Sequence, residues 1–76
     1  MKLNIGCGNK KIEGYLGVDK FKCDAADYIC DIENEKLPFE DSTITGIILD
    51  NAIEHFYDIP KVINELVRVS RKGTTI

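Results

Sequence analysis

Short apolar segments alternate with polar turns over the first two thirds of the chain. The segments are rich in β-branched and aromatic side chains and are bounded by glycine, aspartate or asparagine, which is the pattern of β-strands. They predict four strands, at residues 2–5, 15–18, 28–30 and 43–49. The last of these contains the continuous apolar run Ile47-Ile48-Leu49. Such a run is typical of a strand that is covered on both faces of a parallel sheet.

A helical spacing appears later in the chain. Over residues 59–67, apolar side chains recur at three- and four-residue intervals, which predicts an amphipathic helix. Asp58 is suited to cap its amino terminus, and the basic residues up to Lys72 suit its carboxyl-terminal end. The pattern therefore predicts a helix that continues to Lys72 and stops at Gly73.

The order of these elements predicts the fold class. A shorter helical piece is expected at residues 51–57, and residues 74–76 look like the opening of a fifth strand. No repeat, low-complexity run or linker interrupts the sequence, so residues 1–76 are expected to form one domain. We predict an α/β, Rossmann-like domain with a mostly parallel sheet and flanking helices. It is expected to be incomplete, because it ends near the start of the fifth strand.

Composition and charge exclude several classes of protein. With 43% hydrophobic and 30% charged residues, the chain has the composition of a soluble globular domain. Thirteen acidic residues outnumber ten basic ones, and no basic stripe is present, so nucleic acid is not indicated as a partner. No apolar run approaches the roughly 18 residues of a membrane helix. Three cysteines cannot all pair within the chain, which favours reduced thiols and a cytoplasmic location.

Polar residues stand where each predicted strand ends. The first strand runs into Gly6-Cys7-Gly8, and the others end at or run into Asp19, Asp31 and Asp50. In a parallel sheet these ends share the edge at which open α/β sheets bind ligands. Grouped carboxylates favour a ligand that brings hydroxyls, amines or positive charge between them. Each aspartate alone could simply start a turn, but the combination with a Gly-x-Gly turn favours a ligand-binding edge.

Five short motifs resemble, in order, those of class I S-adenosylmethionine-dependent methyltransferases, in the small-molecule-type branch. They are Leu3-Asn4-Ile5-Gly6-Cys7-Gly8-Asn9-Lys10, Gly14-Tyr15-Leu16-Gly17-Val18-Asp19, Cys30-Asp31-Ile32, Leu37-Pro38-Phe39-Glu40-Asp41 with Glu54-His55-Phe56, and Glu65-Leu66-Val67-Arg68-Val69-Ser70-Arg71-Lys72-Gly73. The resemblance covers nearly the whole chain and corresponds to the amino-terminal part of such an enzyme. It implies methyl transfer from S-adenosylmethionine as the function.

The resemblance also implies roles for single residues. The backbone of the glycine turn would pass beneath the methionine part of the cofactor, and Asp19 would accept hydrogen bonds from both ribose hydroxyls. Asp31 would accept from the adenine amine, and Ile32 would offer an apolar wall. The implied cofactor-binding residues are Gly6, Cys7, Gly8, Asp19, Lys20, Asp31, Ile32, Asp50 and Asn51.

The methyl acceptor stays open, with a small molecule favoured. A general base is needed only if the acceptor must lose a proton, and His55 and Asp50 are the candidates for it. A turn or packing role is the alternative for His55. Because so short a chain buries little core, we also expect either a homo-oligomer or completion by another segment.

One departure from the family pattern concerns the first connection. Only ten residues, Gly8 to Gly17, separate the glycine turn from Val18 and Asp19. A crossover between parallel strands normally takes a dozen or more residues and contains a helix. The first helix is therefore expected to be a turn or to be absent.

The sequence allows three other interpretations. A nicotinamide dehydrogenase shares the Gly-turn and acid pattern, but Lys11 stands where its third glycine is expected. A zinc module from Cys7, Cys23, Cys30 and His55 lacks the close ligand pairs of structural sites, so no metal is expected. The third is a non-catalytic fragment or subunit, which binds the cofactor or completes its sheet by association with another chain.

Overall fold

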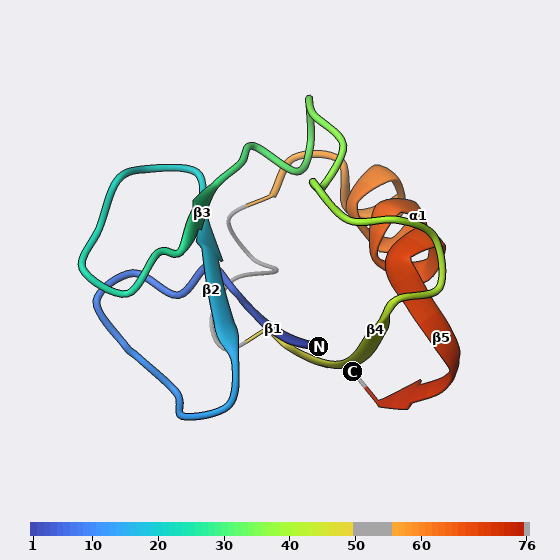
Figure 1. Cartoon of the computed structure of the whole chain (residues 1–76). Coiled ribbons are helices and arrows are strands. Elements are labelled where there is room, and N and C mark those ends of the chain that lie inside the picture. Colours follow the sequence, from blue (N-terminus) through green and yellow to red (C-terminus); the bar gives the residue numbers. More distant parts are fainter. Residues whose placement is uncertain (50–55, 76) are drawn as a thin grey trace.

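A single parallel sheet forms the body of the molecule in the computed structural model, which describes residues 1–49 and 56–75 (Figure 1). The elements are β1 (Lys2–Ile5), β2 (Leu16–Asp19), β3 (Tyr28–Ile29), β4 (Ile44–Ile48), α1 (Ile59–Val69) and β5 (Ser70–Thr75). The five strands lie in the order β3-β2-β1-β4-β5, and every neighbouring pair is parallel. This order is that of the doubly wound α/β sheet. The predicted Rossmann-like α/β fold is confirmed.

The strand order places the candidate site. Chain progression reverses at the centre of the sheet, where β1 lies between β2 and β4. Because all the strands are parallel, the ends of β1, β2 and β3 meet at one edge. The residues that follow these strands are the glycine turn, Asp19 and the segment that contains Asp31. Ligands of open α/β sheets bind at this edge, beside the point of reversal.

One face of the sheet carries the hydrophobic core. Leu3 of β1 pairs with Leu16 on one side and Ile47 on the other, and Ile5 pairs with Val18. These side chains share a face, since side chains alternate along a strand. The buried core contains Leu3, Ile5, Val18, Cys30, Ile32, Leu37, Ile44, Ile47, Val62, Leu66 and Val69.

On the opposite face, the part of the chain that the structure describes places a loop, and no helix, against β2. Residues 6–15, which connect β1 to β2, contain no helix, so the expectation for this connection is confirmed. The loop after β2 lies against the sheet instead: the Gly17 N–H donates to the Asp27 carboxylate, and the Asp27 N–H donates to the Gly17 carbonyl, both at 2.8 Å. A Cβ at Gly17 would collide with the Ala25 carbonyl oxygen and would lie 2.9 Å from the Cys7 Sγ. Glycine is thus required where the loop meets the strand.

Helix α1 packs one stripe of side chains into the core. Its amino terminus is capped by Asp58, whose carboxylate accepts from the Lys61 N–H at 3.1 Å. The residues of the inward stripe are Val62, Leu66 and Val69, all fully buried. The predicted cap is therefore confirmed, and the predicted apolar stripe is confirmed in part, because Val62 and Leu66 are buried while Ile59 and Val67 are exposed.

The predicted end of this helix is wrong. The helix stops at Val69, because Ser70 has an extended backbone (φ −76°, ψ 135°) and its N–H returns to the Leu66 carbonyl. Past Val69 the sequence offers no further apolar side chain for the inward stripe, while Ser70 pairs with Ile44 of β4. Strand β5 therefore begins at Ser70 and not at residue 74, and Gly73 (φ 88°) lies inside the strand.

The shorter helical piece predicted at residues 51–57 falls mostly outside the described residues. Of that piece only Phe56 and Tyr57 are described, and neither is helical. Within residues 1–49 and 56–75, no helix has the length and apolar character needed to cross a membrane.

We expect Gly17→Ala to lower the free energy of unfolding by about 1–3 kcal/mol, because the new methyl group overpacks the contact between β2 and the Ala25 carbonyl. Urea unfolding followed by circular dichroism measures the change. Gly46→Ala is the matched control, since the nearest atoms to a Cβ there belong to the flexible Lys2 side chain, the first at 3.2 Å. An equal loss in both variants would contradict the packing role of Gly17.

Candidate functional site

The turn that follows β1 is built from two glycines with left-handed backbones. Gly6 has φ 68° and Gly8 has φ 55°, a region that glycine adopts without strain. The Gly6 N–H donates to the Val18 carbonyl at 2.8 Å, so the turn is anchored to β2. A Cβ at Gly8 would have no atom within 4 Å. Open space therefore lies directly over the backbone of the turn.

The carboxylate of Asp19 is held against this turn. One of its oxygens accepts from the Gly8 N–H at 2.9 Å, and the other accepts from the Phe21 N–H at 3.0 Å. A carboxylate has about four acceptor positions, so each oxygen can accept one more hydrogen bond. The structure thus brings together two predicted site residues, Gly8 in the turn after β1 and Asp19 at the end of β2.

Cys7 lies beneath the same carboxylate and beside a second cysteine. The Sγ atoms of Cys7 and Cys23 and a carboxylate oxygen of Asp19 all lie within 4.8 Å of one another. Burial raises the pKa of the Cys7 thiol to about 11, and the neighbouring Cys23 and Asp19 add to the shift. Cys23 itself is half-buried, and its thiol donates to the Phe21 carbonyl at 3.3 Å.

The sequence analysis considered Cys23 only as a ligand of the rejected zinc module and did not predict its position beside Cys7 and Asp19. Its thiol reaches Cys7 only because the loop after β2 folds back over the sheet, and no spacing in the sequence signals that path. The third cysteine is separate from this group: Cys30 is buried in the core, and its thiol donates to the Lys36 carbonyl at 3.6 Å. Burial raises the pKa of the Cys30 thiol as well.

Asp31, Ile32 and Lys20 are the other predicted cofactor residues that the structure describes. The Asp31 carboxylate accepts from the Glu33 N–H and the Asn34 side-chain amide, so it closes its own turn. The hydrogen bond from Asn34 lowers the pKa of Asp31. Ile32 is buried in the core, and the exposed Lys20 holds its Nζ 5.6 Å from the centre of the Phe21 ring.

The roles predicted for these residues stay predictions. Three further candidates, Asp50, Asn51 and His55, lie outside the described residues.

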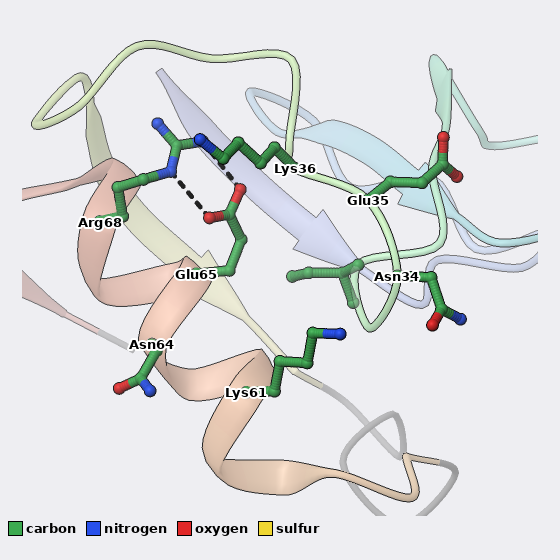
Figure 2. Close-up of a pocket in the computed structure, with 8 residues that line it drawn as sticks. Asn34, Glu35, Lys36, Lys61, Asn64, Glu65 and Arg68 are labelled. Carbon is green, nitrogen blue, oxygen red and sulfur yellow. Dashed lines mark hydrogen bonds and ion pairs between the residues drawn. The ribbon is translucent and has the colours of Figure 1, made fainter.

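A concave feature lies between α1 and the segment that follows β3 (Figure 2). It is an open hollow of about 380 Å³, and its lining residues are Ile32, Asn34, Glu35, Lys36, Lys61, Asn64, Glu65 and Arg68. Charges of both signs line it, so it has no single preference for anions or cations. The sequence did not predict it, because its two walls lie about thirty positions apart in the chain.

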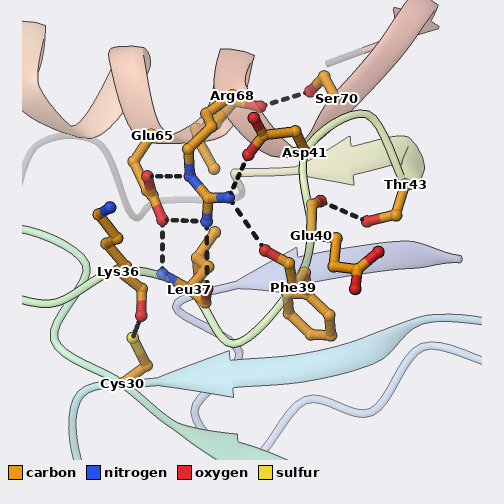
Figure 3. A network of polar contacts seen from close by, with 11 residues as sticks. Cys30, Lys36, Leu37, Phe39, Glu40, Asp41, Thr43, Glu65, Arg68 and Ser70 are labelled. Atoms are coloured by element: carbon orange, nitrogen blue, oxygen red, sulfur yellow. Dashed lines mark hydrogen bonds and ion pairs between the residues drawn. The ribbon is translucent and has the colours of Figure 1, made fainter.

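Arg68 closes one end of this hollow and ties α1 to the chain between β3 and β4 (Figure 3). Its guanidinium forms ion pairs with Glu65 and Asp41, each at 2.7 Å. It also donates to the carbonyls of Phe39 and Leu37, at 3.0 and 3.1 Å. Glu65 in turn accepts from the Leu37 N–H. These bonds hold the segment between β3 and β4 against α1, and they satisfy backbone groups of a segment without regular structure.

Comparison with known proteins gives one match. A family model described as a methyltransferase domain matches residues 18–76, more than three quarters of the chain. The matched range includes Asp19, α1 and the Arg68 network, and it begins after the glycine turn. No curated protein and no solved structure matches the chain.

The Glu65–Arg68 pair predicts how stability depends on pH. The hydrogen bonds from Arg68 hold the pKa of Glu65 below its ordinary value of 4.5. A carboxylate with a lowered pKa stabilises the folded state above its unfolded pKa, and this contribution is lost as the pH falls through the folded pKa. We expect Glu65→Gln to cost about 1–3 kcal/mol at neutral pH and much less in acid. Urea unfolding across that range measures the difference.

Glu40→Gln is the control for this measurement, because Glu40 is an exposed carboxylate in the neighbouring segment. It should change the unfolding free energy by less than about 0.5 kcal/mol at either pH. A cost for Glu65→Gln that persists unchanged in acid would contradict the ionic role of Glu65.

Proposed function

The chain belongs to the methyltransferase-domain family, and from this membership we propose that it binds S-adenosylmethionine at the carboxyl edge of its sheet for methyl transfer. The proposed site consists of the glycine turn after β1 and the carboxylate that ends β2. The observation that carries the proposal is the hydrogen bond from the Gly8 N–H to Asp19. This hydrogen bond holds together Gly8 and Asp19, the two residues that the cofactor would contact at the carboxyl edge of the sheet.

The residues present suit this cofactor. A ribose with two neighbouring hydroxyls needs an acceptor with free lone pairs, and each Asp19 oxygen has room for one more donor. The open space over Gly8 allows a ligand to approach the backbone where a larger residue would place a side chain. A carboxylate is also a favourable neighbour for a ligand that carries positive charge.

The work of the protein in such a reaction is chiefly to bind and align. When bound, S-adenosylmethionine supplies an electrophilic methyl group on a sulfonium ion. The glycine turn and Asp19 would fix the position of the nucleoside, which lowers the entropic cost of bringing the methyl group to its acceptor. Asp31, Ile32 and Lys20 are proposed to complete the adenine side of the site.

Asp50 and Asn51 are proposed to lie beside the reacting centre, with Asp50 or His55 as the base if the acceptor must lose a proton. A small molecule is the proposed acceptor, because the chain carries a formal charge of −3 and no basic stripe for a nucleic acid. A reducing compartment such as the cytoplasm is proposed as well, and it suits the free thiols of Cys7, Cys23 and Cys30.

A second candidate is a subunit that binds the cofactor and pairs with another chain. The edge strand β3 favours it, because Ile29 is 59% exposed there and the nearby Phe21 is 68% exposed. An exposed apolar edge strand is a template for pairing with a second chain. Concentration-dependent dimerisation in sedimentation experiments would support this candidate.

We expect Asp19→Ala to weaken cofactor binding by about 1–3 kcal/mol, the loss typical of a charge-assisted hydrogen bond. Titration calorimetry with S-adenosylhomocysteine, which does not turn over, measures the change. Asp24→Ala is the matched control, because Asp24 is an exposed aspartate of the loop that follows Asp19. Unchanged affinity in a folded Asp19→Ala variant would contradict the assignment of Asp19.

A further inference from the structure

Two thiols and a carboxylate converge at the edge of the glycine turn. The ligand atoms of Cys7, Cys23 and Asp19 lie within 4.8 Å of one another, although the two cysteines are sixteen positions apart in the chain. We propose that these three residues form a binding site for a thiophilic divalent cation, with Zn²⁺ as the best match. This site differs from the zinc module considered in the sequence analysis, because it includes Asp19 and because Cys30 lies apart from it in the core.

The two sulfurs and the carboxylate oxygen of this group are ligands that Zn²⁺ commonly binds. Zn²⁺ binds thiolates at about 2.3 Å and carboxylate oxygens at about 2.0–2.2 Å, usually in tetrahedral geometry. Ligand atoms on one such ion are then about 3.6–3.8 Å apart, so the observed group, with separations of up to 4.8 Å, needs to contract by at most about 1 Å. Three protein ligands leave a fourth position for water or another ligand. Hard cations such as Mg²⁺ prefer oxygen ligands and do not suit two sulfurs.

The surrounding backbone already orients these ligands. The Asp19 carboxylate is fixed by the N–H groups of Gly8 and Phe21, as ligating carboxylates are in metal sites. Cys7 lies against Gly17, which leaves room for its sulfur because it has no Cβ.

The loop that carries Cys23 is tied down on its far side. The Ala25 N–H donates to the Gly8 carbonyl at 3.2 Å, and the Asp24 N–H donates to the Asn9 side chain at 3.1 Å. Cys23 and Asp19 are both half-buried, so an ion can reach the group from their side.

Binding of the ion would release protons from the two thiols and would also occupy Asp19. Each thiol releases its proton to solvent as its sulfur binds, so one ion displaces two protons and the thiols are not oxidised. The ion also occupies the carboxylate that is proposed to hold the cofactor ribose. This part rests on the proposed function: the cation and the nucleoside compete for Asp19.

Cobalt titration of the full chain, kept reduced with a phosphine, tests the site. Co²⁺ alone should bind one equivalent and produce sulfur-to-cobalt charge-transfer absorption, and Zn²⁺ should then displace it. Cys23→Ser should weaken Co²⁺ binding at least tenfold, and Cys7→Ser should do the same. Cys30→Ser is the matched control and should bind as the unmodified chain does, because Cys30 lies in the core.

Several outcomes would overturn the site. They are no charge-transfer absorption, absorption that survives Cys23→Ser, and absorption that is lost in a folded Cys30→Ser variant. Cys23 is half-buried, so its variant tests the site even if a serine at the buried Cys7 disturbs folding.

A separate measurement tests whether the cation and the nucleoside compete for Asp19. Saturating S-adenosylhomocysteine should weaken Co²⁺ binding at least tenfold in the unmodified chain. Binding of both ligands without mutual effect would overturn the sharing of Asp19. Failure of S-adenosylhomocysteine to bind, with the cobalt absorption intact, would refute the proposed cofactor function and leave the metal site standing.

Discussion

The short connection between β1 and β2 is the constraint on which the rest of the structure depends. Two neighbouring parallel strands are joined by residues 6–15 alone, too few for a helix that would cover the sheet. The loop after β2 packs against β2 on the face opposite the core. It can do so only at Gly17, where the absence of a Cβ lets the Ala25 carbonyl approach the strand. The short connection is thus accompanied by a glycine in β2 and by a loop that packs directly on that glycine.

The same constraint shapes the candidate site. Because the chain turns back directly after β1, the Gly8 N–H and the Asp19 carboxylate meet in one hydrogen bond. Because the next loop folds over the sheet, Cys23 is brought to the buried Cys7. The residues proposed to bind the cofactor and those proposed to bind the metal ion therefore lie close together, with Asp19 common to both sets.

The sequence predicted what depends on local pattern. Strand ends were found because glycine and aspartate mark them, and the start of α1 was found because Asp58 caps an apolar stripe. The end of α1 was missed, since the basic residues after it suit a helix terminus while the pairing of Ser70 with Ile44 is a distant contact. The Cys7–Cys23 contact and the Arg68 network were missed for the same reason. Each joins segments that are far apart in the sequence, so a local sequence pattern cannot predict it.

The direct succession of α1 and β5 has a consequence for the length of this segment. Val69 ends the helix and Ser70 begins the strand, so no loop separates them. One residue inserted into the helix would rotate everything after it by about 100° around the helix axis. With no connecting residues to absorb that rotation, the strand would meet β4 with the wrong face or out of register. Insertions and deletions between Asp58 and Ser70 would therefore displace the strand at this edge of the sheet.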